Sequence, residues 1–584
     1  MKKYIIPGLI ALAAGFTACD DVFVPAPENN LPLDYLEENS NYAEGLLGVA
    51  YIALPNGSFP FSEVATDDAV SNDADNSYRI IASGRWTAQN NPINRWEGSR
   101  SAIQYCNLFL ERLDGVTWAA DPDANKYFRE RFEAEARALR AIHMYYLLQS
   151  HAGFDAQGNL LGVPIVETSE SATGSNFNVP RNTFVECMEA MQRDAEFALA
   201  NLPRTYGPEC FDEVRAKHPG ITDGQLERVY GSKFVGRISG EIVEAYLARM
   251  ALMAASPAYE ASGVTWEKAA NLNAKIIGYA GGINGLDPSG ATWYCAPNID
   301  KLGDTESPAE VMWRTTKGSS SDLEKENFPP TLYGNGRINP TQNLVDAFPM
   351  ANGYPISDPR SDYSKDNPYA DRDPRLSLYI LYNGATAGIN NKVITTAADG
   401  TDNDALNKIS TSTRTGYYMK KHLNQSVNCD PSSTQGQVHY TARLRYTEFF
   451  LNYAEAANEA WGPTGTGSNG FSAYDVIKEI RLRAGIGLEN GDAYLEECKA
   501  DKARMRELIR NERRLELCFE GFRFFDLRRW KADLNESAMG VNITDGKYSP
   551  FEVETRNYRD YMYYGPIPYS EVLKFSELHQ NAGW

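Results

Sequence analysis

Helical periodicity dominates most of this chain. Apolar side chains recur at steps of three and four residues, which is the spacing of one face of an α-helix. Within residues 124–152, for example, Phe128, Phe132, Ala136 and Leu139 fall on one stripe. The same pattern predicts helices at residues 41–54, 99–113, 124–152, 183–203, 236–256, 265–282, 444–461, 473–486 and 505–520.

Residues 281–440 break this pattern. They are rich in Gly, Pro, Asn, Thr and Asp and poor in helical stripes, a composition that favours turns and loops. The motif RDPRL is expected to turn at Pro374 and then enter a strand. Earlier in the chain, the predicted helices at 236–256 and 265–282 are rich in alanine, so they can approach closely as an antiparallel pair of tetratricopeptide type.

Residues 505–530 combine an apolar stripe with a row of carboxylates. Glu512 falls on the stripe, and Glu512, Glu516 and Glu520 follow one another at four-residue steps. A bare row of acids weakens a helix, and a buried carboxylate needs a paired, hydrogen-bonded partner. We expect the partners to be arginines of the same stretch, namely Arg510, Arg513, Arg514, Arg523, Arg528 and Arg529. Gly521 is placed to end this helix in the left-handed conformation.

We interpret this stretch as structural and not catalytic, because structural ion pairs outnumber active sites. The predicted structural ion-pair motif comprises Glu512, Glu516, Glu520, Arg523, Asp526 and Arg528. The chain has no H-E-x-x-H motif, no G-x-S-x-G motif and no phosphate-cradling loop, which are the patterns of common catalytic sites. We therefore predict that no residue is catalytic.

The first 38 residues have the pattern of an exported, lipid-anchored protein. Lys2 and Lys3 precede a short apolar stretch, and Cys19 follows two small residues. That order resembles a bacterial lipoprotein signal, with residues 1–18 removed and Cys19 acylated. An ordinary secretory signal with an incidental cysteine is the alternative. Residues 19–38 are expected to form a tether, and no other segment is apolar and long enough to span a bilayer.

Composition narrows the choice of partner. The formal net charge is −20, which argues against nucleic acid because such a partner needs a basic face. The chain has 34 Tyr and 9 Trp, and aromatic rings suit surfaces that stack on flat ligands. Seven cysteines follow Cys19 without any C-x-x-C pair, so we expect buried thiols and no zinc site.

Two aspartate-rich loops are the remaining candidates for a metal site. One contains Asp67, Asp68, Asp73 and Asp75, and the other contains Asp358, Asp362, Asp366, Asp371 and Asp373. Carboxylate oxygens suit calcium, but neither loop has the spacing or the glycine of an EF-hand. We favour solvated acidic loops and predict no metal and no cofactor, with calcium as the weaker alternative.

The candidate ligand-binding residues are aromatic side chains in polar loops. Trp86 lies beside amide side chains, Trp293 and Tyr294 lie in the loop SGATWYCAPN with Asn298, and Tyr333 lies in LYGNGRINP. Sugars present flat C–H faces that stack on such rings, while polar neighbours bond the hydroxyls. Local packing of each ring within its own loop is the alternative.

Several segments resemble one family. NERRLELCFEGFRFFDLRRW (residues 511–530) resembles the C-terminal motif of the SusD/RagB family, which comprises nutrient-binding lipoproteins on the outer membrane of Bacteroidetes-type bacteria. EAEARALRAIHMYYLLQSHAG and LRYTEFFLNYAEAANEAW resemble the family's helix motifs. The resemblance implies a mainly α fold, a tetratricopeptide-like scaffold of helix pairs with a long irregular, loop-rich segment that carries a few short strands. Residues 39–280 and 281–584 would be two parts of one compact body.

The resemblance also implies a function. The chain would bind oligosaccharide or polysaccharide nutrients at the cell exterior and deliver them to a TonB-dependent transporter of the SusC type, without catalysis. An oligopeptide-binding member of the same family is the first alternative, since a groove of Asn and Arg would bond a peptide backbone. A surface glycoside hydrolase would need two facing carboxylates at a fixed separation. A purely structural scaffold protein would bind no soluble ligand.

Overall fold

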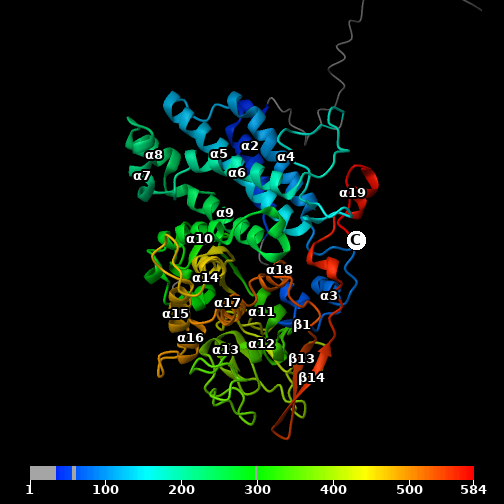
Figure 1. The fold of residues 1–584 in the computed structure, drawn as a ribbon. Helices are drawn as coiled ribbons and strands as arrows, with labels where there is room; N and C mark the ends of the chain where they lie inside the picture. Colours follow the sequence, from blue (N-terminus) through cyan, green and yellow to red (C-terminus); the bar gives the residue numbers. More distant parts are fainter. Residues whose placement is uncertain (1–34, 56–60, 172, 296–298) are drawn as a thin grey trace, which may run out of the picture.

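Helices dominate the structure, and the strands of its described residues are short and pair two at a time (Figure 1). The computed structural model describes residues 35–55, 61–171, 173–295 and 299–584. The α-helices are α1 (Tyr35–Glu38), α2 (Ser40–Ile52), α3 (Ser77–Ala82), α4 (Trp96–Arg112), α5 (Pro122–His151), α6 (Phe184–Asn201), α7 (Phe211–Lys217), α8 (Asp223–Tyr230), α9 (Gly240–Ala255), α10 (Trp266–Tyr279), α11 (Asp322–Asn327), α12 (Gln342–Ala347), α13 (Pro374–Tyr379), α14 (Tyr446–Trp461), α15 (Ala473–Ala484), α16 (Ala493–Cys498), α17 (Lys502–Glu516), α18 (Arg523–Arg529) and α19 (Tyr569–Lys574). The strands are β1 (Ala69–Ser71), β2 (Gly153–Phe154), β3 (Leu160–Leu161), β4 (Val311–Arg314), β5 (Gly318–Ser320), β6 (Ile338–Pro340), β7 (Ile380–Leu381), β8 (Thr386–Ala387), β9 (Lys392–Val393), β10 (Tyr418–Met419), β11 (Gln437–His439), β12 (Ala442–Arg445), β13 (Ala538–Thr544) and β14 (Lys547–Glu554).

The long helices form one continuous stack. α4 packs on α2 and α5, α6 packs on α5 and α9, and α10 packs on α9. α10 also contacts α14, which in turn contacts α15 and α17, so the stack passes from the first half of the chain into the last third (Figure 1). This arrangement confirms the predicted mainly α scaffold of helix pairs.

Helix α5 is the central element of the upper half of the molecule. Pro122 occupies its first turn, and the side chain of Asp121 accepts hydrogen bonds from the first backbone N–H groups, which is a favourable helix start. Ala134, Ala136 and Ala138 are fully buried. Because alanine side chains are small, the neighbouring helices α4 and α6 can pack closely on both sides of α5.

Two other predicted helix starts can be compared with the structure. Thr183 and Glu186 form a capping box at the start of α6, where the predicted helix begins, with both reciprocal hydrogen bonds present. The first long helix was expected to start at residue 41, but Asn39 caps α2. Residues 35–38, the end of the predicted tether, form α1, and Leu36 is buried. The folded body therefore begins before residue 39.

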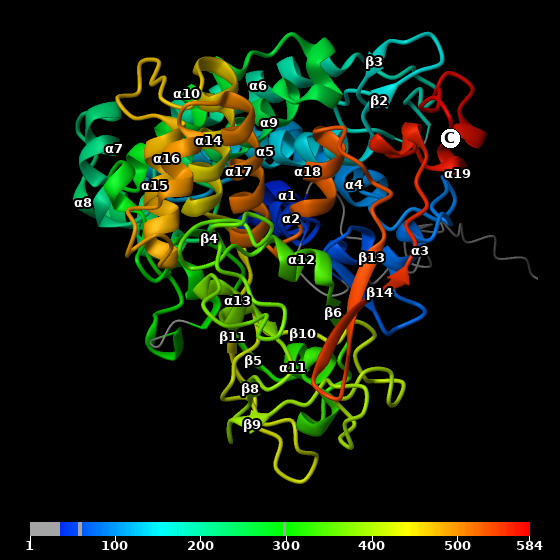
Figure 2. The same ribbon diagram turned by 60° about the horizontal axis from the view of Figure 1, so that its bottom comes forward.

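Strand pairs in and around the loop-rich part connect segments that are distant in sequence. β4 pairs with β12, β5 pairs with β11, and β1 pairs with β6, all antiparallel. These pairings bring residues 311–320 against residues 437–445 (Figure 2). The β1–β6 and β4–β12 pairs hold the irregular segment against the rest of the fold, whereas β5 and β11 both lie within that segment.

Pro374 begins helix α13, so the expected turn directly into a strand is wrong. The side chain of Asp373 accepts a hydrogen bond of 2.9 Å from the backbone N–H of Arg375, and Pro374 occupies the first helical turn. An Asp-Pro pair is as well suited to a helix N-terminus as to a turn. Strand β7 follows only after Tyr379.

The carboxylates of α17 are paired with cations that come from other elements. Glu512 lies 2.7 Å from Arg481 and 2.9 Å from Arg375, and Glu516 lies 2.7 Å from Arg483 and 3.1 Å from Arg375. All five side chains are buried. Since a buried charge needs a partner, this network fixes α17 against α13 and α15.

The expectation that arginines of the same stretch would pair with these carboxylates is wrong for Glu512. On a helix only residues three or four positions apart share a face. The neighbours of Glu512 at those spacings include Leu508, Ile509 and Leu515, none of which carries a charge. The partner must therefore come from another helix or loop.

Helix α17 ends at Glu516, earlier than expected, and the chain turns before Gly521. Phe519 and Gly521 both have positive φ, 61° and 82°. The turn aims the side chain of Glu520 at Arg445 and Lys421, each 2.7 Å away. Glu520 therefore pairs as a turn residue and not as the next step of a helical row.

The arginines of residues 505–530 also have partners, but different ones. Arg513 pairs with Asp526 at 2.7 Å, and Arg523 pairs with Asp67 at 2.9 Å. Arg528 makes no ion pair with a carboxylate of the described residues, and its Nε donates to backbone carbonyl groups. The sequence predicted one ion-pair cluster within residues 505–530, whereas in the structure these charged side chains form several separate contacts.

The prediction of a solvated loop is wrong for Asp67 and Asp68 of the first aspartate-rich loop, whereas Asp75 is exposed. Asp67 and Asp68 are buried, and Arg514 pairs with both, at 2.7 and 2.6 Å. Within the described residues, no group of three or more His, Cys, Asp or Glu side chains is arranged to hold a metal ion. The seven cysteines that follow Cys19 are free thiols, and Cys295 alone among them is half-buried rather than buried.

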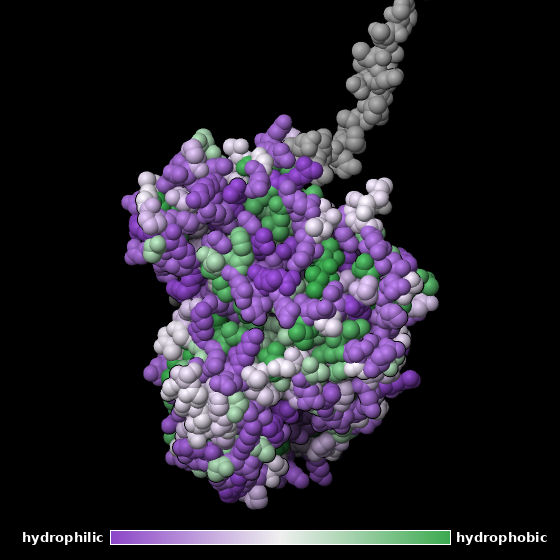
Figure 3. All heavy atoms as spheres, turned by 45° about the horizontal axis from the view of Figure 1, so that its top comes forward, coloured by the Kyte–Doolittle hydropathy of each residue, from purple (hydrophilic) through white to green (hydrophobic). Residues whose placement is uncertain are grey.

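The outer surface is mostly polar. Figure 3 shows a largely hydrophilic face on which apolar residues gather in separate patches. None of the helices in the described ranges has both the length and the apolar character needed to cross a membrane. Cys19 and the signal that precedes it lie outside the described residues.

Candidate functional site

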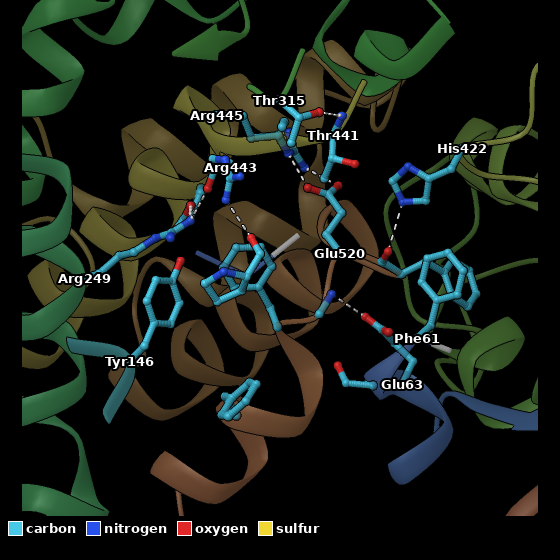
Figure 4. Close-up of a pocket in the computed structure, with 18 of the residues that line it drawn as sticks. Phe61, Glu63, Tyr146, Arg249, Thr315, His422, Thr441, Arg443, Arg445 and Glu520 are labelled. Atoms are coloured by element: carbon cyan, nitrogen blue, oxygen red, sulfur yellow. Dashed lines mark hydrogen bonds and ion pairs between the residues drawn. The ribbon is translucent and has the colours of Figure 1, made fainter. Parts of the chain in front are cut away.

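A cavity of about 710 Å³ lies where the helical stack meets the strand pairs β4–β12 and β5–β11. The C-terminal ends of α5 and α9 form one wall, and the 3₁₀ helix η2 (Ser62–Ala65) and the turn after α17 form another. Figure 4 shows side chains from these separate elements facing a common space. The volume is within the usual range for a small-molecule site.

Aromatic rings form much of the cavity wall. Tyr145 and Tyr146 come from α5, Trp293 and Tyr294 come from η8 (Gly290–Cys295), and Tyr440 links β11 to β12. The rings of Trp293 and Tyr440 lie 5.7 Å apart, and the hydroxyl of Tyr440 donates a hydrogen bond of 2.5 Å to the carbonyl of Trp293. Rings held in this way provide rigid apolar surfaces with polar edges.

Arginine side chains also line the cavity and are held by their partners. Arg249 makes a bidentate contact of 2.7 and 2.6 Å with Glu448. Arg443 donates to the carbonyl of Pro55 at 2.7 Å and lies over the ring of Trp313. Figure 4 shows Arg249 and Arg443 reaching the cavity from neighbouring elements. Such fixed guanidinium groups are good donors to ligand oxygen atoms.

Glu63 is the most unusual carboxylate of the cavity. It is fully buried, and its Oε1 accepts a hydrogen bond of 2.7 Å from the backbone N–H of Gly521. Its Oε2 has no hydrogen-bond partner among the described residues. Burial raises the pKa of Glu63 from its ordinary value of 4.5 to about 7, with Asp68 adding to the shift and Lys421 opposing it.

Three buried nitrogen donors of the cavity lack an acceptor in the described part of the chain. They are Nε1 of Trp293, Nδ2 of Asn452 and Nη2 of Arg528. A buried polar group without a hydrogen bond costs about 1–3 kcal/mol, and such groups in native proteins usually have a reason. The three atoms belong to residues of the cavity wall, but they lie just behind its accessible surface.

The structure separates the predicted ligand-binding residues. Trp293 and Tyr294 line the cavity, although only 4% and 7% of each residue is exposed, so they are wall residues and not open platforms. Tyr333 is 57% exposed, follows η10 (Pro330–Leu332) and does not line the cavity. Asn298 lies outside the described residues.

Trp86 is a core residue, so its prediction as a sugar platform is wrong. Only 2% of it is exposed. Its ring packs against Phe524 and against Trp584 at the C-terminus, with centroid distances of 5.9 and 4.7 Å. Its Nε1 donates a hydrogen bond of 3.0 Å to Asn91. The amide side chain that suggested a binding loop therefore satisfies the buried indole instead.

Sequence reasoning missed most of the cavity residues. Tyr145 and Tyr146 were hidden within a helical stripe, and Glu63 lies in a segment without a clear pattern. Arg249 carried a detectable signal, because it is the one charged side chain in the sequence YLARMALMAAS, which is otherwise apolar or small. A lone arginine on such a helix requires a partner, which here is Glu448.

Comparison of this chain with known protein families identifies the family to which it belongs. The model described as "SusD family" matches residues 307–584, and the model described as "Starch-binding associating with outer membrane", a SusD-like model, matches residues 43–212. This chain belongs to the SusD family. The SusD-like protein P38 of Formosa agariphila is 22% identical over 568 residues, covering 91% of this chain and 92% of that protein.

Solved structures of SusD-like proteins share the fold. One from Bacteroides fragilis has a TM-score of 0.70 at 22% identity, covering 95% of this SusD-family chain and all of the other chain. A second protein of that organism, described as a SusD-like carbohydrate binding protein, has a TM-score of 0.68 at 24% identity and covers 93% of this chain and all of its own. These similarities establish the common scaffold.

Proposed function

We propose that this SusD-family protein binds a nutrient oligosaccharide in the cavity between α5, α9 and the β4–β12 strand pair. The observation that carries the proposal is the composition of the cavity wall, in which fixed aromatic rings alternate with hydrogen-bonding groups. Sugars combine apolar C–H faces with many hydroxyl groups, so they need both kinds of surface. One similar protein is described as carbohydrate binding, which supports this choice over other ligands.

Recognition would use the aromatic rings and the polar side chains of the wall differently. The rings of Tyr146 and Tyr440 would contact the sugar faces, and Gln149, Arg249 and Arg443 would bond the hydroxyl groups. Tyr146 and Gln149 are half-buried and line the cavity, so part of each side chain is accessible to a ligand. The Tyr146 hydroxyl is fixed by a hydrogen bond of 2.7 Å to Tyr246, and fixing groups before binding lowers the entropy cost of recognition.

Binding would proceed without chemistry on the ligand. Glycoside hydrolysis needs a pair of facing carboxyl groups, one of them available as an acid. Of the five Asp and Glu residues of the cavity, Glu448, Glu520 and Asp526 are each ion-paired with an arginine at 2.8 Å or less. Such pairing supports a positional function for these carboxylates. Glu63 is fully buried, and Asp322 is exposed and makes no ion pair with the described residues. A hydrolysis assay on the ligand is the direct check, and release of reducing ends would contradict the proposal.

The location and partner of the protein are part of the same proposal. The signal-like first 18 residues and Cys19 favour a lipid anchor on the outer membrane, with the folded body facing the exterior. The captured oligosaccharide would pass to a TonB-dependent transporter of the SusC type. The second matching family model carries the description "associating with outer membrane", which supports this location. Co-purification of such a transporter with the tagged full chain tests the partnership.

The binding test compares two tyrosines on one helix. Tyr146→Ala removes a cavity ring, whereas Tyr127→Ala removes a half-buried ring of α5 that lies outside the cavity. The best ligand of a glycan and peptide screen is titrated calorimetrically into the full chain and each variant. We expect Tyr146→Ala to weaken binding at least tenfold, since a central aromatic contact is worth ~2 kcal/mol or more, and Tyr127→Ala to leave it unchanged. Equal effects, or a peptide as the best ligand, would contradict the proposal.

A further inference from the structure

The charge of the cavity is opposite to that of the protein. The whole chain carries a formal net charge of −20. Seven arginines but only five Asp or Glu residues line the cavity, and one of those five is the buried Glu63. A cavity with a positive lining is not expected from the average composition of an acidic protein. The lining therefore indicates the charge of the ligand that the cavity binds.

Arg95 and Arg528 have no carboxylate partner in the described part of the structure, and Arg443 is held by the carbonyl of Pro55. Arg249, Arg445, Arg513 and Arg529 are each ion-paired with a carboxylate. By contrast, no ion pair of Arg95 or Arg528 with the described residues is present. Arg528 is 3% exposed. Removing a cation from water without an opposite charge is costly, so its retention beside a cavity needs a reason.

The position of Arg95 strengthens this point. Arg95 is the N-cap residue of α4, and its side chain makes no capping hydrogen bond. A cation at a helix N-terminus is unfavourable, because that end of the helix carries partial positive charge. The presence of an arginine at position 95 is therefore explained neither by the stability of α4 nor by an ion pair with the described residues. It is half-buried and lines the cavity, where it can meet a ligand.

Arg528 is held in place from behind. Its Nε donates a hydrogen bond of 3.0 Å to the carbonyl of Tyr563, and the rings of Trp86 and Phe524 flank its guanidinium at 5.4 and 5.1 Å. Its Nη2 is buried without an acceptor, as is Nε1 of Trp293. These are donor-only groups. Their natural complement is an acceptor-only group, such as a carboxylate or a sulfate.

We infer that the ligand of this cavity is an anionic oligosaccharide, whose carboxylate or sulfate groups bind Arg95 and Arg528. The inference rests on the proposed function, according to which the ligand is an oligosaccharide, and adds that this oligosaccharide is negatively charged. Hydroxyl groups alone would satisfy a polar wall residue such as Gln149, because a hydroxyl both donates and accepts. Only an anion also compensates the two unpaired guanidinium groups. Arginine is well suited to this contact because its planar fork matches both anions.

The test uses ligands that differ only in charge. A polyuronate oligosaccharide is compared with its carboxyl-reduced form, and a sulfated galactan oligosaccharide is compared with its desulfated form. Each is titrated calorimetrically into the full chain at low and high salt. We expect at least one anionic ligand to bind ten times more tightly than its neutral form, with a preference that falls as salt is added. The two pairs distinguish a carboxylate from a sulfate as the bound group.

Two variants link this preference to the cavity. Arg95→Gln removes a cation that makes no ion pair with the described residues, so folding should persist, and its melting temperature is measured first. We expect the preference for the anionic form to fall below threefold. Arg228→Gln, on the exposed side of α8, is the matched control and should keep the full preference.

The outcomes separate the inference from the proposed function. If neutral forms bind the cavity as tightly as anionic forms, or if Arg95→Gln keeps the full preference, the inference is wrong while oligosaccharide binding stands. If none of the four ligands and no glycan of the wider screen binds, the proposed function fails first. A preference that disappears only in Arg228→Gln would place the anionic contact elsewhere on the surface and would also overturn the inference.

Discussion

Nη2 of Arg375 lies 2.9 Å from Oε2 of Glu512, and both side chains are buried. Arg375 belongs to α13 in the loop-rich part of the chain, whereas Glu512 belongs to α17 in the helical stack. The pair therefore joins two regions with different local structure. Because each charge is stable in the interior only with its partner, the pair also defines their relative position.

Removing Glu512 should destabilise the protein strongly. Glu512→Ala leaves Arg375 and Arg481 without one of their carboxylates, and breaking a buried ion pair costs about 3–5 kcal/mol. Chemical denaturation of the variant measures this loss. Glu507→Ala is the matched control, since its carboxylate is on the same helix but is 74% exposed; it should change stability little. A Glu512→Ala variant that kept its stability but lost ligand binding would make Glu512 a functional residue.

Glu63 should make stability depend on pH in the neutral range. Burial raises the pKa of Glu63 in the fold from 4.5 to about 7. The contribution of protonated Glu63 to the free energy of unfolding is therefore fully present below pH 4.5 and is lost as pH rises through 7. Glu63→Gln keeps an acceptor for Gly521 but cannot ionise. We expect the free energy of unfolding of the variant to exceed that of the wild type by up to about 3 kcal/mol at pH 8 and to equal it near pH 4.5.

Denaturation curves between pH 4.5 and pH 8 test this expectation. Glu97→Gln, an exposed change on α4, controls for the loss of one negative charge and should leave the pH dependence of stability unchanged. If the free energy of unfolding of the wild type and of Glu63→Gln varied with pH in the same way, the pKa of Glu63 would not be raised in the fold and the prediction would be wrong.

Trp86 and Trp293 should respond differently to substitution. Trp86→Ala leaves a hole beside Trp584 and removes a buried ring, so it should cost about 3–5 kcal/mol of stability. Trp293→Phe keeps an aromatic ring and removes an Nε1 donor that has no acceptor among the described residues. It should preserve stability but weaken ligand binding about tenfold. Thermal melting and calorimetric titration of both variants separate the effects, and equal binding by Trp293→Phe and wild type would exclude the indole from the site.

Cys19→Ala should release the protein from the membrane. Acyl chains hold a protein through burial of their methylene groups, and stable anchoring takes more than one chain. The variant is expressed without its transporter, so that only the anchor is tested, and detergent partitioning measures its location. Melting temperature should be unchanged, because Cys19 precedes the folded body. A variant that stays with the membrane would contradict the lipid anchor.

The sequence by itself determined the local structure of this protein. Helix positions follow from the spacing of apolar side chains along one segment, and the capping box of Thr183 and Glu186 lies within four consecutive residues. Residues 511–530 were long and distinctive enough to indicate the family. Even the burial of Glu512 followed from its place on an apolar stripe, since a helix face is a property of one segment.

Only the tertiary structure decided which residues meet. Glu512 and Arg375 are separated by 137 positions, and no local pattern couples them. Trp86 and Trp293 both occur in polar loops, yet one packs against the C-terminus and the other lines the cavity. The physical reason is the same in each case. Burial and partners depend on contacts between distant segments, and the unpaired Arg95 and Arg528 become visible only once those contacts are known.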